Sequence, residues 1–81
     1  MIEAYILIQA ETGVAQEVAD RVGDLPGVVS AHAVMGPYDV ITFVQAADVD
    51  EMSEVVIRRL HATAGVARTL TCAIMTPNAE R

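Results

Sequence analysis

The stretch Val34–Phe43 reads VMGPYDVITF, and the fold of the chain can be worked out from it. Apolar residues alternate on both sides of a central turn, as they do in two paired strands with one buried face. The flanking strands are expected over Val28–Met35 and Tyr38–Gln45. Pro37 suits the second position of a turn, and Tyr38 in the third position excludes a type II turn, which needs a positive φ there. The stretch therefore predicts a hairpin built on a type I turn, or on a longer loop that contains one.

Outside the hairpin, the spacing of apolar residues predicts two helices and two more strands. Before it, valines recur along one helix face, and Leu25-Pro26-Gly27 ends that helix. After it, the acidic residues from Asp48 favour a helix start. The expected outer elements are a strand over Ile2–Ala10 with apolar residues on both faces, a helix through Val14, Val18 and Val22, a helix through Met52, Val55, Val56 and Leu60, and a strand over Val66–Met75. The spacing also predicts outer ion pairs of Glu17 with Arg21 and of Glu54 with Arg58.

A weak internal repeat relates the two halves of the chain. A shift of 38 residues superimposes five matching features, which are Val14 on Met52, Val18 on Val56, Val22 on Leu60, Gly27-Val28 on Gly65-Val66 and Tyr5-Ile6 on Phe43-Val44. Two such βαβ halves predict an α+β, ferredoxin-like βαββαβ fold, with a four-stranded antiparallel sheet and two helices on one face. Residues 1–76 are expected to form one domain and residues 77–81 a frayed tail.

Composition predicts that the chain self-associates. Hydrophobic residues make up 53% of only 81 residues, which is more apolar surface than so small a core can bury. One cysteine, Cys72, cannot form an internal disulfide, and no Cys/His cluster has metal-ligand spacing. The sheet face without helices would be apolar and open to water. We therefore predict a homodimer joined through sheet faces or edges, which could assemble further into a ring.

The net charge argues against nucleic acid as a partner, and the N-terminal sequence argues against a membrane. The net charge is -6 and lysine is absent, so direct binding to nucleic acid, which depends on phosphate neutralisation, is not expected. The first ten residues lack the features of a signal peptide, and their apolar run is too short to span a membrane. The sequence predicts a cytoplasmic protein with a reduced thiol and no membrane partner.

The side chains that could support catalysis have simpler interpretations. His61 is expected near the C-terminal end of the second helix, where positive charge is favourable. Packing in the core or in an interface is preferred for His32, and Cys72 is expected to be buried and inert. No phosphate loop, GxSxG or HExxH motif is present. We therefore expect no enzymatic activity, no cofactor and no metal.

The tip of the hairpin has two interpretations. A type I turn requires neither Tyr38 nor Asp39. Tyr38 could pack its ring on the sheet while Asp39 accepts a backbone N–H. Alternatively, Asp39 is a fixed anion at the end of the sheet, able to meet an ammonium group.

Taken together, several short motifs resemble the ligand-binding domain of the leucine-responsive/AsnC regulators, the RAM domain (regulation of amino-acid metabolism). The motifs are the helix-ending PGV, the Gly-x-Tyr-Asp turn of GPYD, and a second GV followed by Thr-x-Thr in GVARTLT. Each is weak alone, but their order and spacing match over Ile2–Met75. The resemblance implies a ferredoxin-like fold, dimers that assemble into octamers or similar rings, and small effectors, typically amino acids, bound between dimers.

The same resemblance implies a ligand-binding site. Gly36, Tyr38 and Asp39 match the turn that lies at the effector site of the family, and Thr69 and Thr71 match threonines of its last strand. Two features depart from the family pattern. The chain has no helix-turn-helix segment, so it is similar to stand-alone RAM proteins, and Pro37 lacks a backbone N–H that could hold a carboxylate.

Three functions follow as hypotheses. The first is a non-enzymatic module that binds an amino-acid effector, oligomerises and takes part in transcriptional regulation or amino-acid sensing. The second is an interaction subunit that forms mixed oligomers with helix-turn-helix relatives. The third is an enzyme of the dimeric α/β-barrel kind, which would need His32 or Tyr38 in a cavity.

Overall fold

A computed structural model describes residues 1–75 of the chain. The elements, in chain order, are β1 (Ile2–Ala10), α1 (Ala15–Gly23), β2 (Val28–Ala33), β3 (Val40–Ala46), a second helix made of α2 (Val49–Glu51), the π-helical η1 (Met52–Ile57) and α3 (Arg58–His61), and β4 (Val66–Ala73). The predicted tail at 77–81, and residue 76 at the predicted domain boundary, lie outside the described residues.

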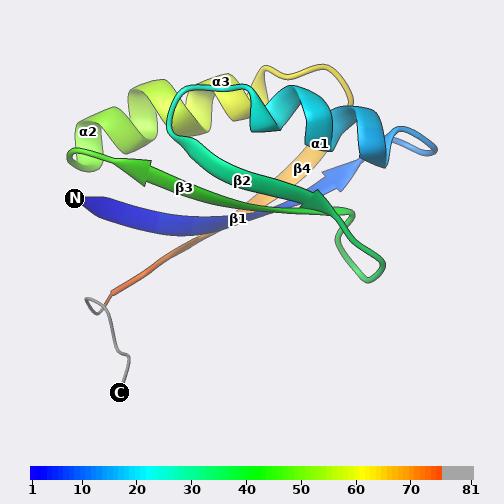
Figure 1. The fold of residues 1–81 in the computed structure, drawn as a ribbon, viewed down its shortest axis with the longest axis horizontal. Coiled ribbons are helices and arrows are strands. Elements are labelled where there is room, and N and C mark those ends of the chain that lie inside the picture. The colour runs from blue at the N-terminus through cyan, green and yellow to red at the C-terminus, as the bar shows by residue number, and fades with distance from the viewer. Residues whose placement is uncertain (76–81) are drawn as a thin grey trace.

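The strands form one antiparallel sheet in the order β2-β3-β1-β4. Both helices cover the same face of this sheet, and the opposite face carries no helix of the described residues (Figure 1). The β2–β3 loop extends past the end of the sheet and bends away from the helix layer. This is the predicted ferredoxin-like architecture.

The core lies between the sheet and the two helices. It consists of twelve buried apolar residues, which are Ala4, Ile6, Ile8, Val18, Ala19, Val22, Val40, Val44, Ala46, Met52, Val56 and Leu60. The predicted helix stripes are confirmed at Val18, Val22, Met52, Val56 and Leu60, whereas the predicted Val55 does not belong to the core. Thr42 is the buried polar residue of this layer, and its hydroxyl donates a hydrogen bond of 2.9 Å to the Ile6 carbonyl. That bond satisfies a hydroxyl that would otherwise be costly to bury.

The internal repeat appears in the structure as two matching helix–strand crossovers. Gly27 and Gly65 both have positive φ, at +87° and +93°. A Cβ at Gly27 would lie 2.6 Å from Val56 Cγ2, and one at Gly65 would lie 2.7 Å from Val18 Cγ2. Each glycine therefore lets the chain pass against the helix of the other half. Glycine is required at both positions by conformation and by space.

Three local predictions are wrong. The hairpin strands were expected to end at Met35 and to begin at Tyr38, but they end at Ala33 and begin at Val40, so six residues connect them. The last strand ends at Ala73 instead of Met75. The predicted pair of Glu17 with Arg21 does not form, because the Arg21 guanidinium donates to the Ala64 carbonyl at 2.9 Å. The other predicted pair, Glu54 with Arg58, is present at 2.8 Å.

The uncovered face of the sheet carries several large apolar side chains. Tyr5 and Leu70 are each 47% exposed, and Ile41 is 36% exposed. Tyr5 and Phe43 lie opposite each other on β1 and β3, with ring centroids 5.1 Å apart. Cys72 lies opposite Tyr5 on this face and is exposed, so the expectation of a buried thiol is wrong. The reason is that β4 is an edge strand and Cys72 faces away from the helices.

Within residues 1–75, no helix is long and apolar enough to cross a bilayer.

Candidate functional site

The β2–β3 loop is closed at its base by one backbone hydrogen bond. The Val34 N–H donates to the Asp39 carbonyl at 2.8 Å. The residues between them form bends, and Tyr38 does not have positive φ. The exclusion of a type II turn is therefore confirmed. The connection is a loop longer than four residues, which was the second of the two predicted possibilities. Gly36 and Pro37 are exposed in this loop, and the Gln9 side chain of β1 donates a hydrogen bond of 3.3 Å to the Pro37 carbonyl.

Asp39 fastens this loop to the end of β1. Its N–H donates to the Ile8 carbonyl at 2.8 Å, and its carboxylate Oδ2 accepts the Ala10 N–H at 2.8 Å. The carboxylate thus accepts the Ala10 N–H at the point where β3 no longer offers a backbone carbonyl to β1. The interpretation in which Asp39 accepts a backbone N–H is confirmed. The second oxygen, Oδ1, makes no hydrogen bond within the described part of the chain.

An apolar hollow lies beside the loop, on the uncovered side of the sheet. Its volume is about 420 Å³, and it is lined by Leu7, Val34, Met35, Gly36, Pro37, Tyr38 and Ile41. Two of the predicted site residues, Gly36 and Tyr38, therefore share one hollow. Asp39 follows Tyr38 directly but does not line it.

The two predicted threonines lie elsewhere. Thr69 and Thr71 are opposite Ile8 and Ile6 on β1. Since both isoleucines face the helices, the threonines also point to the helix side. Strand β1 separates them from β3 and its loop. A single chain therefore does not bring all five predicted residues together.

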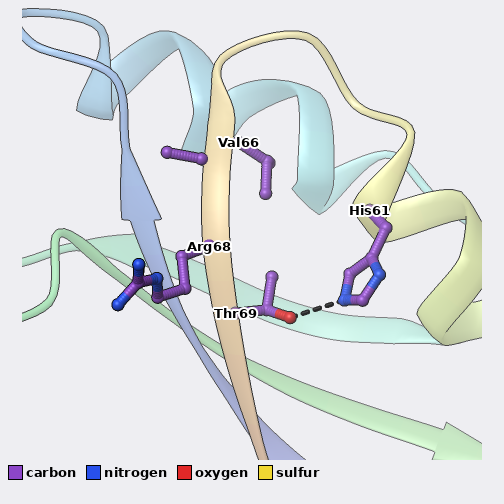
Figure 2. Close-up of a pocket in the computed structure, with 5 residues that line it drawn as sticks. His61, Val66, Arg68 and Thr69 are labelled. Carbon is purple, nitrogen blue, oxygen red and sulfur yellow. Dashed lines mark hydrogen bonds between the residues drawn. The ribbon is translucent and has the colours of Figure 1, made fainter.

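Thr69 borders a second hollow, at the outer edge of β4. This hollow has a volume of about 370 Å³ and is lined by His61, Val66, Ala67, Arg68 and Thr69. Figure 2 shows the imidazole of His61 and the hydroxyl of Thr69 pointing toward each other, and His61 Nε2 lies 2.5 Å from Thr69 Oγ1. Arg68 extends to the other side of the strand.

The predicted position of His61 is confirmed, because it is the last residue of α3. Its contact with Thr69 was not predicted. The two residues are eight apart in sequence, and only the return of the chain from helix to strand joins them. His32 lies opposite Ile41 and is exposed on the uncovered face. Among residues 1–75, no cluster of His, Cys, Asp and Glu could hold a metal ion.

Comparison with known families identifies the domain. The sequence matches the model of the Lrp/AsnC ligand binding domain over residues 3–80. The chain belongs to this family.

Two curated relatives are similar to this chain in sequence. An uncharacterized HTH-type transcriptional regulator of Pyrococcus furiosus is 37% identical over an alignment of 71 residues, and the match covers 84% of this chain and 47% of the regulator. A homocitrate synthase of Sulfurisphaera tokodaii is 33% identical over an alignment of 75 residues, and the match covers 91% of this chain and 16% of the enzyme. The chain thus spans about half the length of the regulator and a small part of the enzyme.

Solved structures agree with the Lrp/AsnC ligand-binding fold. A crystal structure from Thermus thermophilus superimposes with a TM-score of 0.88 at 31% identity, covering 99% of this chain and 100% of that one. A transcriptional regulator from Neisseria meningitidis, solved in complex with L-Met, gives a TM-score of 0.81 at 22% identity, covering 98% of this chain and 53% of that one. At that identity, the second likeness concerns the fold alone.

Proposed function

We propose that this Lrp/AsnC ligand-binding domain is a non-catalytic module that binds a small amino-acid effector and acts in transcriptional regulation by changing its state of assembly. One observation carries the proposal. The loop with Gly36 and Tyr38 lines an apolar hollow of about 420 Å³, and the next residue, Asp39, retains one carboxylate oxygen without a hydrogen bond within the described residues. Apolar walls next to one fixed charge are typical of sites for small amphipathic ligands.

The parts of an amino acid correspond to the parts of this site. An apolar side chain would occupy the hollow beside Leu7, Tyr38 and Ile41. The ammonium group would approach Asp39 Oδ1, while Oδ2 keeps its bond to the Ala10 N–H. Charge-assisted hydrogen bonds of this kind are stronger than neutral ones. Among the described residues that line the hollow, Tyr38 is the only titratable one.

Effector binding and assembly are coupled in this proposal. The hollow opens on the uncovered sheet face, where a homodimer would bury Tyr5, Ile41 and Leu70. Within one chain, strand β1 separates Thr69 and Thr71 from β3 and its loop, so we assign them to a site completed by a neighbouring copy. A ligand held between copies stabilises the assembled state by its higher affinity for that state.

The named relatives support an effector-binding module. The Neisseria regulator is described in complex with L-Met, and the Pyrococcus relative is an HTH-type transcriptional regulator. The similarity to a part of homocitrate synthase is consistent with a module that can be attached to different proteins.

Isothermal titration calorimetry with each of the twenty amino acids, beginning with L-methionine, tests the proposal. We expect saturable heat with at least one of them, together with a change in mass by light scattering. If none of the twenty binds and the mass stays constant, the proposal fails. Co-purification with a helix-turn-helix relative, without any small-molecule affinity, would instead support a subunit of mixed oligomers. The similarity to the Pyrococcus regulator favours that second candidate.

A further inference from the structure

Another hollow lies at the end of the sheet opposite the β2–β3 loop, and we call it the distal groove. Its volume is about 360 Å³, and its lining includes Met1, Val28, Val29, Ala46, Ala47 and Glu51. Figure 1 shows the amino terminus, the end of β3 and α2 together at one end of the fold, and the β2–β3 loop at the other. None of the lining residues belongs to the proposed effector site, so the groove is available for a separate contact.

The apolar wall of the distal groove is open to solvent at Val29, which is 56% exposed. On β2, Val28 pairs with Val44 and Ser30 pairs with Phe43, so the register shifts at Val29. Val29 is therefore the extra residue of a β-bulge, and bulges at sheet edges re-aim side chains. Within residues 1–75, β2 has no strand on its other side. The groove is thus continuous with an open edge of the sheet.

Carboxylates border the distal groove, and each has one oxygen held in place. Glu51 Oε1 accepts the Ala47 N–H at 2.5 Å, and Asp48 Oδ1 accepts the Glu51 N–H at 2.8 Å. On the sheet, Glu3 Oε2 accepts from the Gln45 side chain at 2.8 Å. The second oxygen of each carboxylate makes no hydrogen bond within residues 1–75. Three oriented carboxylates therefore retain an oxygen that can accept from a partner.

Positive charge is scarce at this end of the molecule. Arg21 donates to a backbone carbonyl just before β4, and Arg68 lies near the start of β4, which pairs with the far end of β1. Arg58 and Arg59 belong to the last turn of the second helix, whereas the groove lies at its first turn. Among the lining residues, the one positive charge is the α-amino group of Met1. The groove therefore complements a positively charged partner.

We propose that the distal groove docks a short segment of a partner protein in which an apolar residue is flanked by arginine or lysine. The apolar side chain would pack against Val29, and the cationic groups would meet the remaining oxygens of Glu51 and Asp48. Arginine and lysine suit such a site because their alkyl stems cover apolar surface while their charged ends stay in water. A second copy is a poorer occupant, since this chain has no lysine and a net charge of -6. This inference does not rest on effector binding.

Titration of the ¹⁵N-labelled protein with the peptide Arg-Arg-Val-Arg-Arg, monitored by NMR, tests the groove. We expect saturable shifts of the Val29 and Ala47 amide signals. The peptide Glu-Glu-Val-Glu-Glu should cause none, and Arg-Arg-Ser-Arg-Arg should bind about fivefold more weakly because it lacks the apolar side chain. Equal binding of the valine and serine peptides would indicate charge attraction alone and would overturn the proposal, as would the absence of shifts.

Spectra without peptide distinguish a partner protein from a second copy. If the sheet face self-associates, the Tyr5 and Leu70 signals should change with protein concentration. We expect the Val29 and Ala47 signals to stay constant over the same range. A change in these two signals that follows concentration would show that another copy occupies the groove, and would overturn the proposal. Failure of all twenty amino acids to bind would overturn only the proposed function.

Two glutamate variants of matched charge test the electrostatic contact. Glu51→Gln removes the charge but keeps an acceptor for the Ala47 N–H, and it should weaken binding of the valine peptide about two- to fivefold. Glu17→Gln is the control, because it makes the same change of net charge in the first turn of α1, outside the groove. Its affinity should equal that of the wild type. Circular dichroism should show both variants folded. Equal affinities of the two variants would contradict the contact.

The apolar contact has its own test. Val29→Ser should weaken binding of the valine peptide about fivefold and leave binding of the serine peptide unchanged. Val49→Ser is the control, since Val49 is 64% exposed and does not line the groove, and it should bind both peptides as the wild type does. Equal losses for the two peptides in Val29→Ser would contradict packing of the peptide valine against Val29.

Discussion

At the residue scale, Asp39 has two tasks that a sequence cannot separate. One carboxylate oxygen holds the Ala10 N–H, and the other is available to a ligand. The motif made Asp39 a candidate for ligand binding, but its structural partner could not be predicted, because Ala10 is 29 residues away and meets Asp39 only once β1 and β3 pair. A simple truncation of Asp39 would therefore confuse loss of fold with loss of binding.

Two substitutions at Asp39 separate these tasks. Asp39→Ala leaves the Ala10 N–H without its acceptor and should lower the free energy of unfolding by about 1–3 kcal/mol. Asp39→Asn keeps an acceptor oxygen and should cost less than about 1 kcal/mol. Both remove the negative charge, so both should weaken amino-acid binding about tenfold or more. Urea unfolding and calorimetry measure the two effects. Unweakened binding in a folded Asp39→Asn variant would exclude the ammonium contact.

At the scale of elements, the order of strands and helices could be predicted because periodicity and the repeat agree. The helix start was equally clear, and Asp48 caps it by accepting the Glu51 N–H at 2.8 Å. The ends of the hairpin strands were not predictable. The loop is closed by a backbone hydrogen bond from Val34 to Asp39, and nothing in the local sequence indicates this bond. The π-helical turns of η1 were also missed. An apolar spacing of four residues fits several helix types, and packing decides among them.

The two crossover glycines give a test at this scale. Gly27→Ala should destabilise the fold by about 2–4 kcal/mol, because its Cβ meets Val56 in a left-handed backbone conformation. Gly13→Ala is the matched control, since Gly13 has φ +82° but no described atom within 4 Å of an added Cβ. It should cost only about 1–2 kcal/mol, the conformational part. Urea denaturation of both variants separates packing from conformation. Equal losses would show that Val56 moves aside easily.

At the scale of the whole molecule, the main feature is the imbalance between the two sheet faces. The helices cover one face completely enough that Ile8, Val40 and Val44 have no exposed area. The other face exposes Tyr5, Leu70 and Ile41. A small domain gains stability by burying such a surface against another copy. Composition predicted this face, but it could not show which residues remain exposed.

A charge on the uncovered face should prevent self-association. We expect Leu70→Glu to weaken the dimer at least about tenfold, because assembly would bury an unpaired carboxylate. Val49→Glu is the control, since Val49 is 64% exposed at the start of the second helix and lies away from the sheet face. Analytical ultracentrifugation should show Leu70→Glu as a monomer under conditions in which the control stays associated. Identical behaviour of the two variants would place the interface elsewhere.

The exposed thiol of Cys72 supplies a natural reporter for this surface. It is the single cysteine of the chain, and it lies opposite Tyr5 on the uncovered face. A thiol reagent can therefore modify the protein at one known position without any engineered label. The rate of modification would report the fraction of molecules whose uncovered sheet face is accessible. Its dependence on protein concentration would measure assembly. An effector that closes this face would protect the thiol, and one that opens it would speed its modification.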